Sequence, residues 1–153
     1  MGYEEKIAAH MEKIKPLIES GEELLITFYG FYTSRGYQFG GKPNLNGTWA
    51  MTDKRLLFTG KAGFSSGWSG YGKAGKIMTI PYSQIVEMIH KKNKIYINHT
   101  AEHEGRPEGK VRRIILAPHR LKRVPETGKK ESKQDYIARA EMIYNKIKEL
   151  AGG

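Results

Sequence analysis

The sequence predicts a mainly β domain of the α+β class: a seven-stranded antiparallel barrel with a C-terminal capping helix and an extra N-terminal helix. Apolar residues recur at helical spacing in residues 3–19 and again in 132–151. Between them, residues 23–117 alternate short β-branched and aromatic runs with Gly, Pro, Asn and Ser, which is typical of a meander of strands. A chain of 153 residues suits a single domain, so we assign all of it to one core.

The N-terminal helix is indicated by Ile7, Met11 and Ile14, which are separated by charged residues. We expect Pro16 to bend or end it and Gly21 to stop it.

In the C-terminal helix, Ser132 and Asp135 have the spacing of a capping box. The stripe that follows, which includes Ile143 and Ile147, is broad enough to need a core, and the end of the barrel is the nearest candidate.

We expect the seven strands at residues 23–33, 45–53, 54–60, 76–81, 84–90, 94–100 and 110–117. Alternation predicts that one face of the second strand carries Leu45, Trp49 and Met51. By the same rule, one face of the sixth strand carries Ile95, Ile97 and His99. Lys91-Lys92-Asn93-Lys94 is interpreted as a tight turn, because Asn tolerates positive φ. The 18 glycines are interpreted mainly as loop residues.

The net charge of +10 is concentrated in one part of the chain. Residues 1–90 hold 10 Lys and Arg against 8 Asp and Glu, residues 91–133 hold 13 against 5, and residues 134–153 hold 3 against 3. Such asymmetry favours an anionic partner.

Three motifs carry a resemblance to a known family. They are SGEELL (residues 20–25), GTWAMTDKRLLF (47–58) and IPYSQIVEM (80–88). Their order between two helices resembles the pleckstrin-homology-like superfold, specifically the bacterial and archaeal PH-like and GRAM-like families. The resemblance implies a binding module. The residues of these motifs also have interpretations that do not depend on the family. We expect Thr52 and Asp53 to form a turn and Pro81 to end a strand. Arg55 is interpreted as solvated or ion-paired.

The sequence departs in two ways from the pattern of eukaryotic PH domains that bind phosphoinositides. The first strand has no basic residue between Glu23 and Thr33, and the C-terminal helix has no Trp. The resemblance therefore favours blunt electrostatic or protein binding over stereospecific recognition of inositol phosphates.

Two glycine-rich loops, residues 34–44 and 61–75, combine aromatic and basic side chains. We expect the aromatics to contact a membrane interface and the cations to bind its anionic lipids. The alternative is that the aromatics fold back on the barrel or pack between subunits. The aromatics are Tyr37, Phe39, Phe64, Trp68 and Tyr71, and the cations are Arg35, Lys42, Lys61 and Lys73.

A basic stretch, residues 91–133, would bind phosphates of lipid or of nucleic acid, or else be a solvated surface. Nucleic acid is the weaker hypothesis, because no zinc-finger, helix-turn-helix or RNP pattern occurs. The lipid-binding or anion-binding candidates here are Arg112, Arg113, Arg120, Lys122 and Arg123, accompanied by Lys91, Lys92, Lys94, Lys129 and Lys130.

No enzyme is predicted, since no nucleophile elbow, P-loop or dinucleotide motif occurs. We predict no cofactor, and no metal at the His99, His103 and Glu104 cluster, because a catalytic zinc needs three rigidly held ligands. The lack of Cys fits a reducing cytoplasm. With no secretory signal or long apolar run, we expect a cytoplasmic protein at the inner membrane face, bound to anionic phospholipid, to a protein partner or to a second copy.

Overall fold

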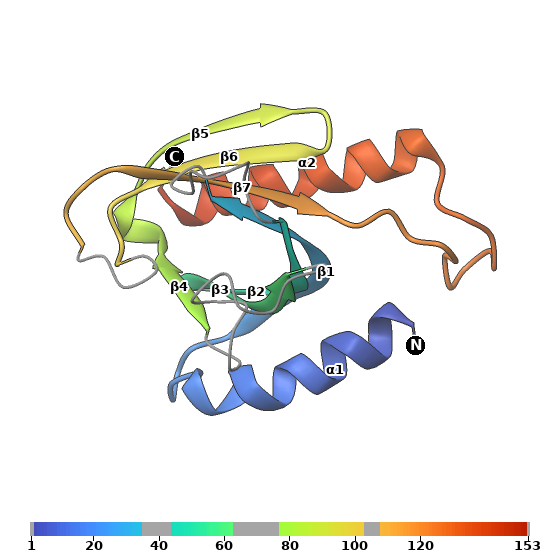
Figure 1. Cartoon of the computed structure of the whole chain (residues 1–153), viewed down its shortest axis with the longest axis horizontal. Coiled ribbons are helices and arrows are strands. Elements are labelled where there is room, and N and C mark those ends of the chain that lie inside the picture. The colour runs from blue at the N-terminus through green and yellow to red at the C-terminus, as the bar shows by residue number, and fades with distance from the viewer. Residues whose placement is uncertain (1, 35–43, 63–76, 103–107, 153) are drawn as a thin grey trace.

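A computed structural model describes residues 2–34, 44–62, 77–102 and 108–152 (Figure 1). The helices are α1 (Tyr3–Ile14), the 3-10 turns η1 (Lys15–Leu17) and η2 (Tyr82–Gln84), and α2 (Lys133–Leu150). The strands are β1 (Leu24–Ser34), β2 (Asn44–Thr52), β3 (Arg55–Ala62), β4 (Met78–Pro81), β5 (Ile85–Lys91), β6 (Lys94–His99) and β7 (Arg112–Pro118). The mainly β, α+β class with a helix at each end is confirmed.

The seven strands form one antiparallel sheet in the order β4-β3-β2-β1-β7-β6-β5. The sheet curves so that β5, β6 and β7 lie across from β2, β3 and β4 (Figure 1). Among the described residues no ladder joins β4 to β5, so the barrel is open along that seam.

The core fills the concave side of the sheet. Trp49 and Phe58 meet there with ring centroids 4.8 Å apart, and Tyr32 packs 5.3 Å from Phe58. Ile143 and Ile147 of α2 join the same cluster, which confirms that the C-terminal helix closes the barrel. The predicted faces of β2 and β6 are also confirmed, since Leu45, Trp49, Met51, Ile95, Ile97 and His99 are all fully buried.

The convex side of β2 and β3 is buried as well, beneath α1. Met11 and Ile14 of the helix pack on Ala50 and Leu57 of the two strands. Small and medium side chains here let the helix lie close to the sheet. The N-terminal helix therefore covers its own domain, a point that periodicity alone left open.

A row of three glycines crosses β1, β2 and β3. Gly30 pairs with Gly47, and Gly47 pairs with Gly60. A Cβ added at Gly47 would lie 2.1 Å from the carbonyl oxygen of Thr59, and one at Gly30 would lie 2.5 Å from that of Ala117. Only glycine fits such close backbone approach. All three lie within strands that the sequence predicts, at residues 23–33, 45–53 and 54–60, so they are strand residues rather than loop residues.

Local turn and cap predictions are mostly confirmed. Thr52 Oγ1 accepts from the amides of Lys54 and Arg55, at 3.1 and 3.0 Å, and so forms the predicted turn. Ser132 Oγ accepts from the Asp135 amide at 3.0 Å and caps α2. In the β5–β6 hairpin, however, the positive φ of 54° falls on Lys92. The Asn93 side chain instead donates to the Tyr136 hydroxyl at 3.2 Å.

Candidate anion-binding surface

The predicted basic stretch divides between the two ends of β7. Ile114, near its start, pairs with Ser34, whereas Pro118, at its end, pairs with Gly30. At about 3.3 Å per residue, the seven residues of β7 span roughly 20 Å. Arg112 and Arg113 therefore lie far along the strand from the residues after Pro118.

Arg113 is engaged by the sheet itself. Its Nε donates to Asn98 Oδ1 at 2.8 Å, and its guanidinium lies 5.5 Å from the centre of the Tyr96 ring. Asn98 Nδ2 in turn donates to Glu87 at 2.9 Å. Arg112 pairs with His99 across the ladder and is half-buried. Because neighbouring side chains on a strand point to opposite faces, Arg113 lies on the outer face of β6 and β7, whereas Arg112 lies on the face that carries Ile114.

Beyond Pro118 the basic residues gather at one end of the molecule. The connector 119–132 brings its cations beside the β5–β6 turn, because Tyr136 of α2 accepts from Asn93 and donates to the Pro118 carbonyl. Figure 1 shows the turn, the connector and the start of α2 on the same side. We define the basic end by its eight exposed cations: Lys91, Lys92, Lys94, Lys122, Arg123, Lys129, Lys130 and Lys133.

A buried carboxylate holds the connector in shape. Glu131 is 5% exposed and accepts from Arg139 Nε at 2.9 Å and from the Leu121 amide at 3.0 Å. Burial opposes its ionisation, but the hydrogen bonds from Arg139 and Leu121 outweigh burial and hold the pKa of Glu131 below its usual value. Arg120 Nε donates to the Glu131 carbonyl at 2.7 Å, so Arg120 braces the loop.

An aromatic cluster joins the connector to α1. His119 Nε2 lies 3.0 Å from Asn46 Oδ1, and its Nδ1 lies 3.1 Å from the Tyr3 hydroxyl. The imidazole stacks on Phe31 with centroids 4.0 Å apart, and Tyr3 stacks on Tyr29 at 5.0 Å. Burial, followed by the charges of Lys6 and Lys122, lowers the pKa of His119 to about 4. The first turn of α1 is thereby fixed beside the basic end.

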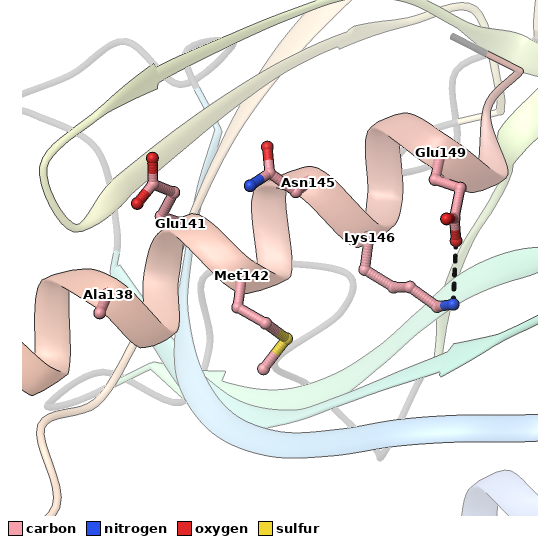
Figure 2. A pocket seen from close by; sticks show the side chains of 6 residues that line it. All are labelled: Ala138, Glu141, Met142, Asn145, Lys146 and Glu149. Atoms are coloured by element: carbon pink, nitrogen blue, oxygen red, sulfur yellow. Dashed lines mark hydrogen bonds and ion pairs between the residues drawn. The ribbon is translucent and has the colours of Figure 1, made fainter.

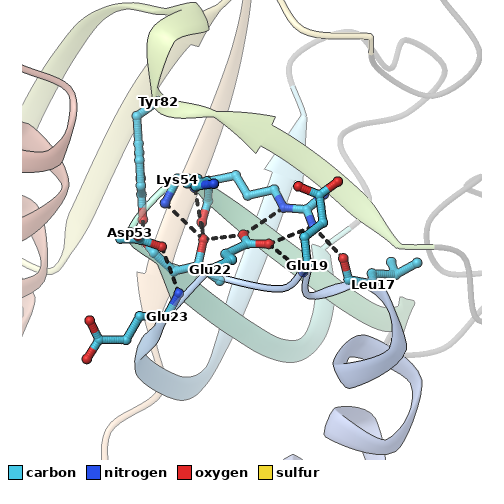
Figure 3. Close-up of polar contacts among 9 residues, drawn as sticks. Leu17, Glu19, Glu22, Glu23, Asp53, Lys54 and Tyr82 are labelled. Carbon is cyan, nitrogen blue, oxygen red and sulfur yellow. Dashed lines mark hydrogen bonds and ion pairs between the residues drawn. The ribbon is translucent and has the colours of Figure 1, made fainter.

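At the opposite extreme from the exposed cations of the basic end, a buried charge is paired within the fold at the Glu22 corner (Figure 3). We define this corner by Glu22, Thr52, Arg55 and Tyr82. Glu22 takes a bidentate contact from Arg55, at 2.9 and 3.0 Å, and a hydrogen bond of 2.6 Å from Thr52. The hydrogen bonds from Arg55 lead the causes that lower the pKa of Glu22 to about 2. The Tyr82 hydroxyl donates to the Thr52 carbonyl at 2.7 Å. Arg55 is therefore a structural partner, as the ion-pair interpretation predicts.

Of the candidates in the glycine-rich loops, Lys61 alone lies within the described residues. Lys61 lies on β3, where its backbone pairs with Asn46. The strand ends that carry these loops lie at the end of the β1–β7 ladder away from the connector. The candidates outside the described residues are Arg35, Tyr37, Phe39, Lys42, Phe64, Trp68, Tyr71 and Lys73.

His99 is a core residue rather than a surface ligand. Its Nδ1 accepts from the Ala101 amide at 3.1 Å, and burial, with a smaller contribution from Arg112, lowers its pKa to about 4. His103 and Glu104 lie outside the described residues. Within the described ranges, no three His, Asp or Glu side chains are grouped to hold a metal ion. No helix in that part of the chain is long and apolar enough to cross a membrane.

The outer face of α2 is a second exposed surface (Figure 2). An open groove of about 410 Å³ runs along it, lined by Ala138, Met142 and polar neighbours. Met142 is 48% exposed there. Val86 on the edge strand β5 is 60% exposed, beside a smaller cavity of about 210 Å³ between β5 and the end of α2.

No protein-family model matches the chain, and no curated protein matches it. Among solved structures, the chain is similar to the C-terminal domain of an unknown protein from Leishmania infantum. The TM-score is 0.42 and the identity 17%, over 72% of this chain and 83% of that chain. At this level the similarity carries no argument about fold or function.

Proposed function

We propose that this chain is a non-enzymatic PH-like binding module that docks on anionic phospholipid surfaces through its basic end. One observation carries the proposal: eight exposed cations from three separate segments converge at one end of the domain. Of the acidic residues in 119–133, Glu126 is exposed and Glu131 is buried against Arg139. The local field is therefore strongly positive.

The energetics suit reversible docking. Each Lys or Arg near an anionic membrane surface contributes about 1 kcal/mol, so several acting together retain the domain at low salt. Screening shortens the range of this attraction to about 8 Å at physiological ionic strength, so binding should weaken steeply as salt rises. The glycine-rich loops leave the sheet at the other end of the β1–β7 ladder, so we assign docking to the basic end.

Vesicle co-sedimentation tests the proposal. We expect the chain to pellet with vesicles of equal phosphatidylcholine and phosphatidylglycerol and to stay in solution with phosphatidylcholine alone. Lys129→Gln with Lys130→Gln should weaken binding about tenfold or more, because two surface cations are lost. The control, Lys13→Gln with Lys54→Gln, removes the same charge elsewhere and should bind like the parent chain. Equal recovery with both vesicle types contradicts the proposal. So does complete displacement by a mixed-sequence oligonucleotide at vesicle excess, which indicates nucleic acid.

A second candidate function is protein interaction or self-assembly, favoured by the exposed Val86 on the free edge of β5. An edge strand offers unpaired backbone groups to another strand. Light scattering discriminates: a stable oligomer that dissociates in Val86→Lys, at a position 60% exposed, supports this function. If light scattering shows a monomer at all concentrations, self-assembly is excluded as the function.

A further inference from the structure

A cavity of about 370 Å³ lies between the first turn of α1 and the connector. Tyr3 and Lys6 line it from the helix, and Leu121, Lys122, Arg123 and Pro125 line it from the connector. The hydrogen bond between Tyr3 and His119 joins these two walls, so they are held in place together. The volume falls in the range of pockets that take small ligands.

Cations from both walls converge on this cavity. Lys6 Nζ lies 5.8 Å from the centre of the Tyr3 ring and 5.2 Å from that of Tyr29, which places it at the inner side of α1. Lys122 and Arg123 are exposed on the opposite wall. The charges of Lys6 and Lys122 both lower the pKa of His119, so both act on the same imidazole.

The two acidic residues of the lining offset only part of this positive charge. Glu4 and Glu5 belong to the first turn of α1, and Glu5 Oε1 accepts from the Gly2 amide at 3.2 Å. Glu5 is thus turned toward the start of its own helix. Three cations against Glu4 and Glu5 leave room for one further anionic group.

The chemistry of the walls selects the ligand class. Arg presents a planar fork that matches a phosphate, and Lys adds compact point charges. Tyr3, Leu121 and Pro125 add an apolar surface that suits an organic body next to the phosphate. We propose that this cavity binds the phosphate group of one anionic lipid headgroup, with Lys6, Lys122 and Arg123 as its cationic partners. The inference rests on the proposed function and gives that docking a specific site.

His119 provides a local readout. A phosphate between Lys6 and Lys122 offsets the two charges that disfavour imidazolium, so ligand binding should raise the pKa of His119. Non-specific screening by salt would raise the same pKa gradually and without saturation.

The test is an NMR titration of the His119 imidazole in the full chain, with glycerol 3-phosphate as the soluble headgroup. We expect a saturable shift that sodium chloride at equal ionic strength does not reproduce. Lys122→Gln should weaken the apparent affinity about tenfold, because a charge-assisted contact is lost. Lys13→Gln, on the same helix but outside the cavity, should titrate like the parent chain. A non-saturable shift, or an unchanged affinity in Lys122→Gln, overturns the inference.

Vesicle binding distinguishes a lipid headgroup from a free phosphate compound as the ligand. It also distinguishes failure of the cavity proposal from failure of the proposed function. Reduced binding of Lys122→Gln to phosphatidylglycerol vesicles supports a lipid headgroup. Saturable binding of glycerol 3-phosphate with unchanged vesicle binding in that variant points to a free phosphate compound and overturns the lipid assignment. Vesicle binding without a saturable His119 shift removes the cavity alone and leaves the proposed function. Circular dichroism confirms that each variant is folded.

Discussion

The Glu22 corner and the basic end hold charge in opposite ways. At the corner, Arg55 donates two hydrogen bonds to the Glu22 carboxylate, at 2.9 and 3.0 Å. The Thr52 hydroxyl and the Glu19 amide also donate to this carboxylate. At the basic end, eight cations are exposed, and the buried carboxylate among them, Glu131, is already taken by Arg139.

The difference teaches which charges support the fold and which are free for a partner. A buried carboxylate that loses its partner destabilises the fold, because the remaining charge has no water to solvate it. An exposed Lys on a loop contributes little to stability. Substitutions in the two regions should therefore separate stability from binding, and four predictions examine that separation.

Of the substitutions considered, Gly47→Ala should lower the free energy of unfolding most, and the other effects can be compared with it. The new methyl group would meet the Thr59 carbonyl at 2.1 Å and the Gly60 Cα at 2.5 Å, and neither is a flexible side chain. We expect the free energy of unfolding to fall by more than about 3 kcal/mol, or soluble expression to fail. Urea unfolding measures this. The control is Gly21→Asn, since nothing lies within 4 Å there and Asn tolerates its φ of +87°. A mild effect at Gly47 would mean that β2 and β3 can move apart there.

Acid should act on the buried histidines and on the Glu22 corner in different pH ranges. His99 and His119 are neutral in the fold, with pKa values lowered to about 4 from 6.5, so the unfolded chain binds more protons and stability falls as pH drops from 6.5 to 4. This loss is on the order of 3 kcal/mol at fully buried His99 and smaller at His119, which is partly exposed.

The carboxylate of Glu22 contributes stability above pH 4.5, and this is lost as pH falls from 4.5 to 2. Urea unfolding across pH 7 to 2 should therefore show a continued decline below pH 4.5. In Glu22→Gln that lower part should flatten, while the decline between pH 6.5 and 4 remains. A lower part unchanged by the substitution would assign it to other carboxylates.

At neutral pH, Glu22→Gln should cost about 2 kcal/mol of unfolding free energy, because Arg55 loses its charged partner while Gln retains part of the hydrogen bonding. Its binding to anionic vesicles should equal that of the parent chain. Glu23→Gln is the matched control, because Glu23 is exposed and its side chain lies outside the pair. Equal stability of the two variants would show that the corner contributes nothing net.

The smallest stability effect is expected at the basic end. Lys129→Gln with Lys130→Gln should change the free energy of unfolding by less than about 0.5 kcal/mol, because both side chains are exposed. The same variant should bind anionic vesicles about tenfold or more weakly, as proposed above. A large destabilisation would erase the contrast with the Glu22 corner and identify these lysines as structural.

The sequence alone determined what depends on near neighbours. Helical spacing located both helices, the side chains of Thr52 and Ser132 marked a turn and a cap, and alternation assigned Trp49 to the core. Each of these rests on residues within a few positions, where hydrogen bonding and periodicity act directly. The stretch rich in Lys and Arg was also visible in the sequence, but its division between the two ends of β7 was not.

Tertiary structure decided everything that depends on register between distant segments. Gly30, Gly47 and Gly60 lie far apart in the chain, and only strand pairing aligns them in one row. Glu22 reaches Arg55 because β1 pairs with β2 and β2 turns into β3. The cavity beside Lys122 exists because α1 packs on the convex face of the sheet. Pairing and packing of this kind follow from the burial of the whole chain, which no local pattern records.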